Sequence, residues 1–359
     1  MAMTTTQPSH QAQVSARTSQ AFERLAEPFR REIKVHCYRM LGSLHEADDA
    51  VQETYLRAWR SFDSFVEGSF RAWLYRISTN VCLNAIESRK LVQRLLPDLL
   101  APAAAAIQMP DGPPPTEVAW LEPYPDSNLE GIADDAPNPE ARYASREAVQ
   151  LAFVAAIQVL PPRQRATLLL CDVLGWAATE AATLLGGSTA SVNSALQRAR
   201  ETLAKRYPTG QPAAALRPDD SAQQELLNRY LKAWEGHDLN GFVALLKEDA
   251  TFTMPPWLLW FAGRQAIGSF FAMAWKTCGG LRLVPAAANR QPAFAVYERS
   301  GADARWAAHS IHVLTLEHDI ISTLTLFVPP LGPRLFHAFG LPLVIPEAAR
   351  AESGSTPRH

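Results

Sequence analysis

Two proline-bearing stretches limit what this chain can fold into more than any other feature. Ten prolines lie between Pro97 and Pro139, and proline lacks the backbone N–H that helices and strand ladders need. A shorter stretch from Pro208 to Pro218 again combines proline with glycine and alanine, a composition typical of linkers. The chain of 359 residues suits two or three domains, so we expect separate folded parts joined by these linkers.

The stretch from Pro161 to Tyr207 has the pattern of a helix-turn-helix. Gly186 favours the left-handed backbone that ends a helix, and Ser188 can cap the next one. The apolar residues of that second helix recur at helical spacing: Val192, Ala195, Leu196, Ala199 and Leu203. Its remaining polar residues are Thr189, Ser191, Asn193, Ser194, Gln197, Arg198 and Arg200. Hydroxyls and amides read base edges and arginine binds phosphate or guanine, which favours a DNA-reading helix over an ordinary helical hairpin with a solvated basic face.

This stretch resembles region 4 of the bacterial extracytoplasmic-function (group 4) sigma factors. The resemblance is carried by Leu160 to Arg165, Leu174-Gly175-Trp176, Glu180-Ala181-Ala182 and Ser191 to Arg200. It implies that the seven polar residues of the second helix read the −35 promoter element.

The N-terminal part carries three helical patterns, from Phe22 to Leu41, from Glu46 to Trp59 and from Phe70 to about Arg89. On the second helix, Asp48, Asp49, Gln52 and Glu53 form an outward acidic row, for which periodicity alone favours a solvated face. Phe65 and Trp73 can receive an unstacked base while Arg71 and Arg76 hold the strand. Plain core packing is an equally good explanation of Trp73.

This part resembles region 2 of the same sigma family. The matching residues are Cys37 to Gly42, Ala47 to Trp59 and Phe70 to Asn80. The resemblance implies that the acidic row binds the β′ clamp of core RNA polymerase, with the β flap as a further contact of the chain. It also implies that the −10 element is melted and read by Phe65, Arg71, Trp73, Arg76 and Asn80.

The proline-rich linker is acidic. Between Arg94 and Arg142 there are nine Asp or Glu residues and no Lys or Arg, as in a solvated linker. Trp120, Leu121 and Tyr124 stand out, because a linker that needs only solubility has no use for large apolar side chains between prolines, so we predict that they dock. In sigma factors the equivalent linker passes through the polymerase cleft. The heptad from Trp120 to Asp126 resembles a linker motif of members with a C-terminal extension, so polymerase and the C-terminal domain are both candidate partners.

The C-terminal part begins near Ser221 with helices, followed by a strand meander, which predicts an α+β fold. The expected helices are 226–234, 239–246 and 265–274, and the expected strands are 251–254, 281–287, 293–298, 306–316 and 320–327. Leu231 to Trp234, His237-Asp238, Asp249 to Phe252 and Gly263-Arg264 resemble the SnoaL-like branch of the NTF2-like superfamily. That resemblance implies a curved sheet wrapped by helices into a cone with a pocket.

Candidate pocket residues of the cone are Trp234, Trp257, His309 and His312. On a regular strand His309 and His312 point to opposite faces, and no paired acid and base is evident, so we predict no catalytic residue and no enzyme. A small ligand in the cone and a structural or regulatory domain both stay open. The apolar tail from Gly332 to Pro346 is expected to pack against another domain.

Charge and composition bear on the partners. The net charge of −2 is unusual for a protein that binds DNA alone, because phosphate neutralisation supplies most of that affinity. Such a chain binds DNA weakly or gains affinity from a partner, for which the resemblance implies core polymerase. The polar N-terminus and the absence of an eighteen-residue apolar run predict a cytoplasmic protein with no membrane contact. The four cysteines lack metal-ligand spacing, so we expect buried reduced thiols and no metal or cofactor.

The sequence thus predicts a multidomain chain with two all-α sigma domains, a region 2 helical bundle and a region 4 helix-turn-helix, followed by an α+β NTF2-like cone. The expected boundaries are a disordered N-terminus 1–20, region 2 at 21–95, linker 96–141, region 4 at 142–207, linker 208–220, cone 221–330 and tail 331–359. The expected function is that of an alternative sigma factor whose activity is modulated by the cone. The alternative is a small-molecule enzyme or ligand sensor fused to a DNA-binding module.

Overall fold

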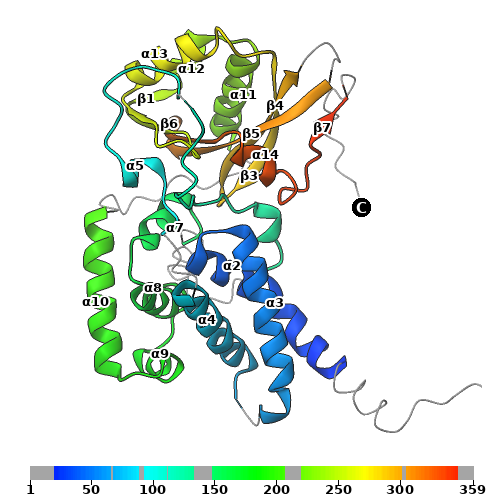
Figure 1. Cartoon of the computed structure of the whole chain (residues 1–359), viewed down its shortest axis with the longest axis vertical. Coiled ribbons are helices and arrows are strands. Elements are labelled where there is room, and N and C mark those ends of the chain that lie inside the picture. Colours follow the sequence, from blue (N-terminus) through cyan, green and yellow to red (C-terminus); the bar gives the residue numbers. More distant parts are fainter. Residues whose placement is uncertain are drawn as a thin grey trace, which may run out of the picture. The chain divides into compact units, whose positions relative to one another are not determined.

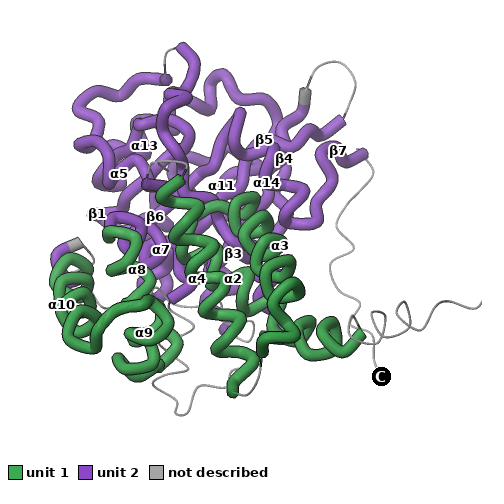
Figure 2. The backbone as a smooth tube through the Cα atoms, turned by 60° about the horizontal axis from the view of Figure 1, so that its bottom comes forward, with its two compact units in different colours: residues 1–91, 131–142, 160–203 green, residues 92–130, 143–159, 204–359 purple. Residues whose placement is uncertain are grey.

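A computed structural model describes residues 20–65, 68–88, 93–110, 112–132, 148–206, 220–300 and 305–346. The chain divides into two compact units (Figure 2). Unit 1 comprises residues 1–91, 131–142 and 160–203, and unit 2 comprises residues 92–130, 143–159 and 204–359. The N-terminus expected to be disordered, except for residue 20, and most of the 208–220 linker lie outside the described residues, as does the tail beyond residue 346.

The first half of unit 1 is helical. Its elements are η1 (Glu27–Phe29), α2 (Arg30–Leu41), α3 (Leu44–Arg60), η2 (Phe62–Ser64) and α4 (Phe70–Ser88). Helix α2 ends because Gly42 takes a φ of 72° and its N–H donates to the Tyr38 carbonyl. The side chain of Ser43 then caps α3. His36 on α2 is buried 2.9 Å from the Thr79 hydroxyl on α4, and burial, with the charge of Arg39, lowers the pKa of His36 to about 3.

The second half of unit 1 is the helix-turn-helix. It contains α8 (Pro162–Leu168), the π-helical turn η4 (Leu169–Val173), α9 (Ala178–Leu185) and α10 (Thr189–Arg206). Gly186 ends α9 with a φ of 63°, and a reciprocal pair of backbone-to-hydroxyl bonds between Ser188 and Ser191 starts α10. The two segments and the glycine between them lie where the sequence predicts them.

One buried cation joins the two halves of unit 1. Arg165 on α8 is 4% exposed, and its guanidinium donates to the carbonyls of Met40 and Leu160. Burial lowers the pKa of Arg165 to about 10. The rings of Tyr75 on α4 and Trp176 before α9 add an edge contact at 5.8 Å. The helix-turn-helix therefore packs on α2 and α4, and this packing includes a charged and an aromatic contact.

Unit 2 is an α+β domain (Figure 1). The sheet strands are β1 (Leu246–Thr253), β2 (Trp260–Ala262), β3 (Leu281–Ala288), β4 (Gln291–Ser300), β5 (Arg305–Glu317) and β6 (Ile320–Phe327), in the order β2-β1-β6-β5-β4-β3. All neighbours are antiparallel except β1 and β6. Helices α11 (Ser221–Glu235), α12 (Leu239–Val243) and α13 (Arg264–Ala274) share one apolar core with the inward residues of the sheet. The α+β class is confirmed, but α12 is shorter than predicted because β1 already begins at Leu246, and β2 was not predicted.

The linker and the lead-in to the helix-turn-helix also belong to unit 2. They form α5 (Pro97–Leu100), η3 (Asp126–Asn128) and α7 (Leu151–Gln158). Trp120 forms a parallel bridge with Leu95, and Pro125 an antiparallel bridge with Ala288. The described part of the proline-rich segment in unit 2, residues 97–110 and 112–130, is therefore largely irregular in its backbone, as its composition predicts, yet it is packed on the sheet domain.

The apolar tail lies on the sheet of its own unit. Helix α14 (Leu331–Leu335) packs on β5 and β6, and β7 (Val344–Ile345) pairs with β5. Phe336 is fully buried with its ring 5.1 Å from Tyr297, whose hydroxyl donates to the Pro342 carbonyl. The expectation of packing against another domain is replaced by packing on unit 2, because the outer face of β4 and β5 offers the apolar surface that the tail needs.

Two further sequence expectations concern membranes and thiols. Within the described ranges no helix combines the length and the apolar character needed to span a bilayer. Cys37 and Cys82 are buried, whereas Cys171 and Cys278 are partly exposed. The prediction of buried thiols is thus wrong for the last two, which sit near helix or strand ends where the surrounding chain covers them incompletely.

Candidate nucleic-acid interface

Helix α10 presents a polar face to solvent. Ser191, Asn193, Ser194, Gln197, Arg198 and Arg200 are exposed and Thr189 is half-buried, while Val192, Leu196 and Ala199 are buried on the opposite side. The helix is thus amphipathic in the sense that the apolar spacing predicts. Its outward groups include hydrogen-bond donors and acceptors at the length and spacing that suit a major groove.

Two of these residues already have partners within unit 1. The Ser191 hydroxyl donates to the Ser188 carbonyl at 2.7 Å and accepts from its N–H, so it is part of the helix cap. Arg200 makes a bidentate ion pair with Asp172 on η4, at 2.6 and 3.0 Å, which raises the pKa of Arg200 through that hydrogen bond. Both residues therefore shape the helix-turn-helix, and neither is free for a base in this state.

The other polar residues of α10 are less engaged. The Gln197 amide donates to Glu201 at 3.0 Å, an exposed pair that solvent screens. Among the described residues, the side chains of Asn193 and Arg198 have no hydrogen-bond or ion-pair partner. These two side chains therefore keep their hydrogen-bonding capacity for a partner from outside.

The aromatic residues before and within α4 form a cluster. Phe65, Phe70 and Trp73 are half-buried, and their ring centroids lie 5.2 to 5.4 Å apart. Phe70 in turn contacts Phe22, Phe29 and Phe62. The rings meet edge-on or tilted, and an unstacked base could replace one of these contacts by stacking on a ring face.

A groove of about 810 Å³ runs beside this cluster. Its walls come from the η2–α4 loop and α4 on one side, including Phe65, Trp73 and Arg76, and from α9 and the turn before it on the other, including Trp176 and Glu180. The groove is open to solvent and mixes aromatic surface with cations. This combination suits a single nucleic-acid strand, whose bases stack and whose phosphates need positive charge.

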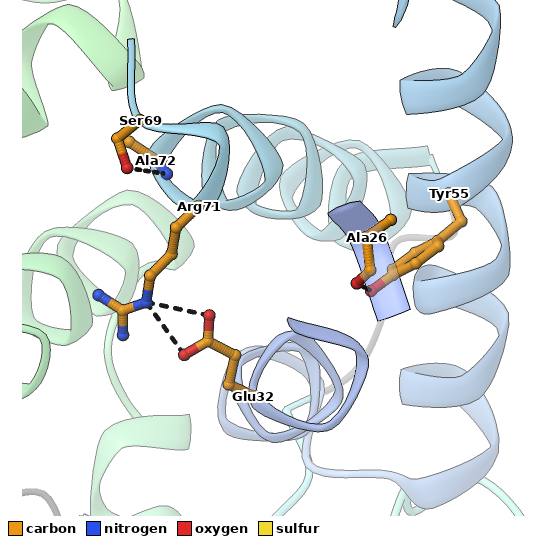
Figure 3. A network of polar contacts seen from close by, with 6 residues as sticks. All are labelled: Ala26, Glu32, Tyr55, Ser69, Arg71 and Ala72. Carbon is orange, nitrogen blue, oxygen red and sulfur yellow. Dashed lines mark hydrogen bonds and ion pairs between the residues drawn. The ribbon is translucent and has the colours of Figure 1, made fainter. Parts of the chain in front are cut away.

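The polar residues of this region differ in how they are held. The Nε of Arg71 lies 3.0 Å from both carboxylate oxygens of Glu32 on α2, as Figure 3 shows, and its guanidinium lies over the Tyr75 ring. The same view shows the Tyr55 hydroxyl donating to the Ala26 carbonyl and the Ser69 hydroxyl accepting from Ala72 at the start of α4. Arg76 and Asn80 are exposed one and two turns further along α4. Arg71 is therefore fixed within the bundle, whereas Arg76 and Asn80 face water.

The acidic row lies on α3 where the sequence predicts a surface helix. Asp48, Asp49 and Glu53 are half-buried and Gln52 is exposed. Asp48 pairs with Lys34 at 2.6 Å and Glu53 with Arg57 at 2.6 Å. These are surface pairs worth roughly 0–1 kcal/mol each, so another protein's cations could compete for the carboxylates.

The docking residues of the linker are buried in unit 2. Leu121 and Tyr124 are fully buried and Trp120 is 7% exposed. The backbone of Tyr124 exchanges two hydrogen bonds of 2.8 Å with Asn289, at the turn between β3 and β4. The heptad therefore lies on the C-terminal sheet domain within unit 2.

The four candidate pocket residues of the cone lie in or beside its core. Trp234 is 4% exposed in the core, and Trp257 packs against that core. His312 is 1% exposed and lies between the Tyr230 hydroxyl at 2.9 Å and the Ser310 hydroxyl at 3.0 Å. Burial lowers the pKa of His312 well below its ordinary value, which makes this imidazole a neutral, hydrogen-bonded core group.

The assumption of a regular strand fails at His309. A register shift in the β4–β5 pairing sets Val296 opposite Ser310 and Tyr297 opposite Ala308, which leaves His309 as an extra residue. Its Nδ1 lies 3.1 Å from the Ser310 hydroxyl, the same hydroxyl that contacts His312. The two histidines are thus linked through Ser310, although alternation predicts that they lie apart. Burial lowers the pKa of His309, against the opposing charge of Glu298.

Sequence reasoning missed the residues that hold the linker and the helix-turn-helix. Asn289 and Gln291 are 0% and 1% exposed, and Arg165 is 4% exposed. The available signal was weak: Asn289 opens a short polar break between two apolar strands, a common sign of a hairpin turn. Nothing in the pattern indicates which distant backbone groups these side chains contact.

Comparison with known proteins finds the same order of domains along the chain. Family models match at residues 25–92 (Sigma-70 region 2), 150–203 (Sigma-70, region 4) and 227–323 (SnoaL-like domain). The ECF RNA polymerase sigma factor SigG of Mycobacterium tuberculosis (strain H37Rv) is 44% identical over 329 residues, which cover 89% of this chain and 84% of SigG. SigE of Mycolicibacterium smegmatis is 32% identical over 167 residues, 46% of this chain and 53% of SigE.

A solved structure shares the fold along most of the chain. The crystal structure of the Mycobacterium tuberculosis extracytoplasmic function sigma factor SigJ aligns with a TM-score of 0.57 at 23% identity, covering 90% of this chain and 99% of SigJ. The helical bundle, the helix-turn-helix and the α+β domain thus occur together in a second protein. The long match to SigG and the matches to the two sigma regions show that the chain belongs to the family of extracytoplasmic-function (ECF) RNA polymerase sigma factors.

Proposed function

We propose that this protein binds core RNA polymerase and directs it to specific promoters as an alternative sigma factor. The exposed polar face of α10 carries the proposal: Asn193, Gln197 and Arg198 lie together on a helix-turn-helix with an apolar back. In this proposal, α10 reads the −35 element in the major groove. The half-buried Thr189 and the exposed Ser191, Ser194 and Arg200 complete that face, with Ser191 and Arg200 acting chiefly through helix shape.

Region 2 is assigned the −10 element. The aromatic cluster of Phe65 and Trp73 would take an unstacked base in the groove beside α4. Arg76 and Asn80 are exposed toward a strand, while Arg71 supports the groove through its pair with Glu32. Opening a duplex costs a few kcal/mol per flipped base, and stacking on an aromatic ring returns about 1–3 kcal/mol.

We assign the binding of core RNA polymerase to the acidic row of α3, and the regulation of transcription to the C-terminal domain. Asp48, Asp49, Gln52 and Glu53 would contact the β′ clamp, in competition with the surface pairs that they form in the free chain, and the β flap would be a second contact. The fused C-terminal domain would adjust transcription without chemistry of its own, since the buried His312 is held by Tyr230 and Ser310 and the half-buried His309 lies against the same Ser310 hydroxyl. This assignment places the protein in the cytoplasm with the polymerase.

Run-off transcription tests the proposal. The full chain is mixed with bacterial core polymerase on a library of promoter fragments, each supplied as duplex and as a template already opened over the −10 region. Trp73→Ala is expected to lower output from the duplex about 5- to 100-fold and to recover most of it on the opened template. If wild type gives no promoter-specific transcript and does not bind core polymerase, the proposed function is refuted. If Trp73→Ala lowers output equally on both templates, Trp73 serves packing and not base recognition.

A further inference from the structure

An ion pair between Asp172 and Arg200 ties α10 to η4, the turn that precedes α9. The Nε of Arg200 donates to one carboxylate oxygen of Asp172 at 3.0 Å, and a terminal nitrogen donates to the other oxygen at 2.6 Å. Where the structure describes α10, its other side-chain hydrogen bonds stay within that helix and its cap. Asp172 is therefore the polar group through which η4 acts on α10.

The backbone that carries Asp172 is unusual. The turn η4 is π-helical, and the Leu174 N–H donates to the Leu169 carbonyl, five residues earlier, at 3.0 Å. Such turns are rare and occur frequently at functional sites. Leu169 and Leu170 are buried, whereas the side chain of Asp172 is 30% exposed and that of Arg200 is 59% exposed. A turn with an apolar inner side thus holds an accessible carboxylate beside α10.

Arg200 lies in one row with two residues to which we assign base reading. Asn193, Gln197 and Arg200 are spaced by four and three residues, which places them along one side of the helix, and all three are exposed. An amide recognises a base edge by its pattern of donors and acceptors. A guanidinium can instead bind any phosphate, and such a contact carries no sequence information.

A carboxylate is well suited to keep a guanidinium from phosphates. Carboxylates and phosphates both present a pair of oxygens that matches the guanidinium fork. Asp172 occupies one edge of that fork and balances its charge. A phosphate that approaches Arg200 must therefore displace the carboxylate before it gains the full attraction of the cation.

The pair bears differently on cognate and on unrelated DNA. On a cognate site, base contacts fix the position of α10 in the groove. On unrelated DNA the helix is free to shift until a cation reaches a phosphate. A released Arg200 would thus strengthen binding to unrelated DNA more than binding to the −35 element.

We propose that Asp172 is a specificity-determining residue of region 4, which withholds Arg200 from sequence-independent phosphate contacts. The inference rests on the proposed function and deepens it, since it names a residue outside α10 that sets how selectively α10 binds. Asp172 is a positioning residue here: it touches no DNA and acts through Arg200. Weak binding to unrelated DNA matters because a genome offers a large excess of unrelated sites.

Three variants of the full chain isolate this role. Asp172→Asn keeps the size of the side chain and removes its charge, whereas Arg200→Gln removes the cation. The double variant is the matched control, because any effect of the lost negative charge that does not pass through Arg200 persists in it. Ion pairs this exposed contribute little to folding, so the melting temperatures of all three should stay close to that of wild type.

Fluorescence anisotropy measures binding of the full chain to a short labelled duplex with a scrambled −35 element. Asp172→Asn should bind about tenfold more tightly than wild type near 50 mM salt and about threefold more tightly near 200 mM, because one added phosphate contact steepens the salt dependence by about 0.9. The gain should vanish when the double variant is compared with Arg200→Gln. No gain in Asp172→Asn, or an equal gain in the double variant, would refute the proposal.

Two further measurements test specificity itself. The gain of Asp172→Asn should be smaller on a duplex with the −35 element of a promoter selected in the run-off assay. With core polymerase, run-off from that promoter and from its scrambled counterpart in one reaction should show a ratio of transcripts about threefold lower than for wild type. An equal gain on both duplexes and an unchanged ratio would mean that Asp172 sets the strength of binding and not its specificity, which overturns the proposal.

Failure of the proposed function is separable from failure of this role. Anisotropy on the scrambled duplex needs neither polymerase nor promoter, so it reports on the restraint of Arg200 alone. If wild type gives no transcript and does not bind core polymerase, the proposed function fails and the specificity role fails with it, even where Asp172 restrains Arg200. If wild type transcribes and Asp172→Asn does not differ from it in either assay, only the role of Asp172 is refuted.

Discussion

The same two residue types serve opposite purposes in the two units. On α10, Asn193 and Gln197 are exposed, whereas Asn289 and Gln291 in the β3–β4 turn are buried and bonded to backbone groups of distant segments. An exposed amide keeps its hydrogen-bonding capacity for a partner from outside. A buried amide must satisfy that capacity within the chain, because an unpaired polar group in the interior costs about 1–3 kcal/mol. Exposure, and not residue type, therefore separates the polar face of α10 from the internal hydrogen bonds of the β3–β4 turn.

The largest expected effect tests the exposed side of this comparison. Arg198→Ala should lower transcription from a cognate promoter about 10- to 100-fold, since one bidentate base contact is worth about 1–3 kcal/mol. Binding to core polymerase and the melting temperature should not change, because the Arg198 side chain is exposed. Run-off assays and core-binding titrations measure the two quantities. Lys205→Ala, an exposed cation further along α10, is the control, and an equal loss there would mean that general charge, not recognition, is at work.

A smaller effect tests the buried side. Gln291→Met keeps the volume but leaves the Leu151 N–H and the Thr315 hydroxyl without this partner, so the free energy of unfolding of unit 2 should fall by about 2 kcal/mol. Hydrogen exchange of the β5 amides measures it in the full chain. The matched control is Gln265→Met on the exposed face of α13, with an expected change within about 0.5 kcal/mol. If both variants lower the free energy of unfolding by similar amounts, buried and exposed amides do not differ in the way proposed.

The smallest effect is pH-dependent and concerns Asp126. Burial, with a contribution from Glu130, raises the pKa of Asp126 to about 6, against the N–H and charge of Arg290. The folded chain therefore holds a proton between about pH 4 and 6 that the unfolded chain releases, so this group's stability contribution is present below pH 4 and is lost as pH rises through 6. Asp126→Asn cannot ionise and still accepts from the Arg290 N–H.

In the Asp126→Asn variant, the free energy of unfolding of unit 2 should thus exceed that of wild type by about 1–2 kcal/mol at pH 7.5. This value is smaller than the whole pKa shift of Asp126 implies, because Asp126 is partly exposed. The difference should shrink toward zero by pH 4. Exchange of the β5 amides in both chains at each pH isolates this residue from the buried histidines, which are common to the two. A constant difference across pH would assign the effect to packing.

The sequence predicts most of what is periodic and little of what is long-range. The spacing of Val192, Leu196 and Ala199 places α10 correctly and also indicates its outward residues. The helix-sheet order of unit 2 follows from its strand meander. The partners of Asn289 lie at Tyr124 and Val149, 140 or more residues away, and no local pattern specifies such a pair. Similarly, the irregular register at His309 reverses a conclusion that depends on strict alternation.

The guanidinium of Arg165 is buried, but water can replace the carbonyl groups that it binds. Its guanidinium is almost fully buried against the carbonyls of Met40 and Leu160, between the helix-turn-helix and the first helices of unit 1. A purely apolar seam loses its whole stabilisation when water enters, but a buried cation regains its hydration at that moment. Water thus acts as a competing ligand for Arg165. A seam that contains such a cation therefore loses less stabilisation on hydration than an apolar seam of the same area.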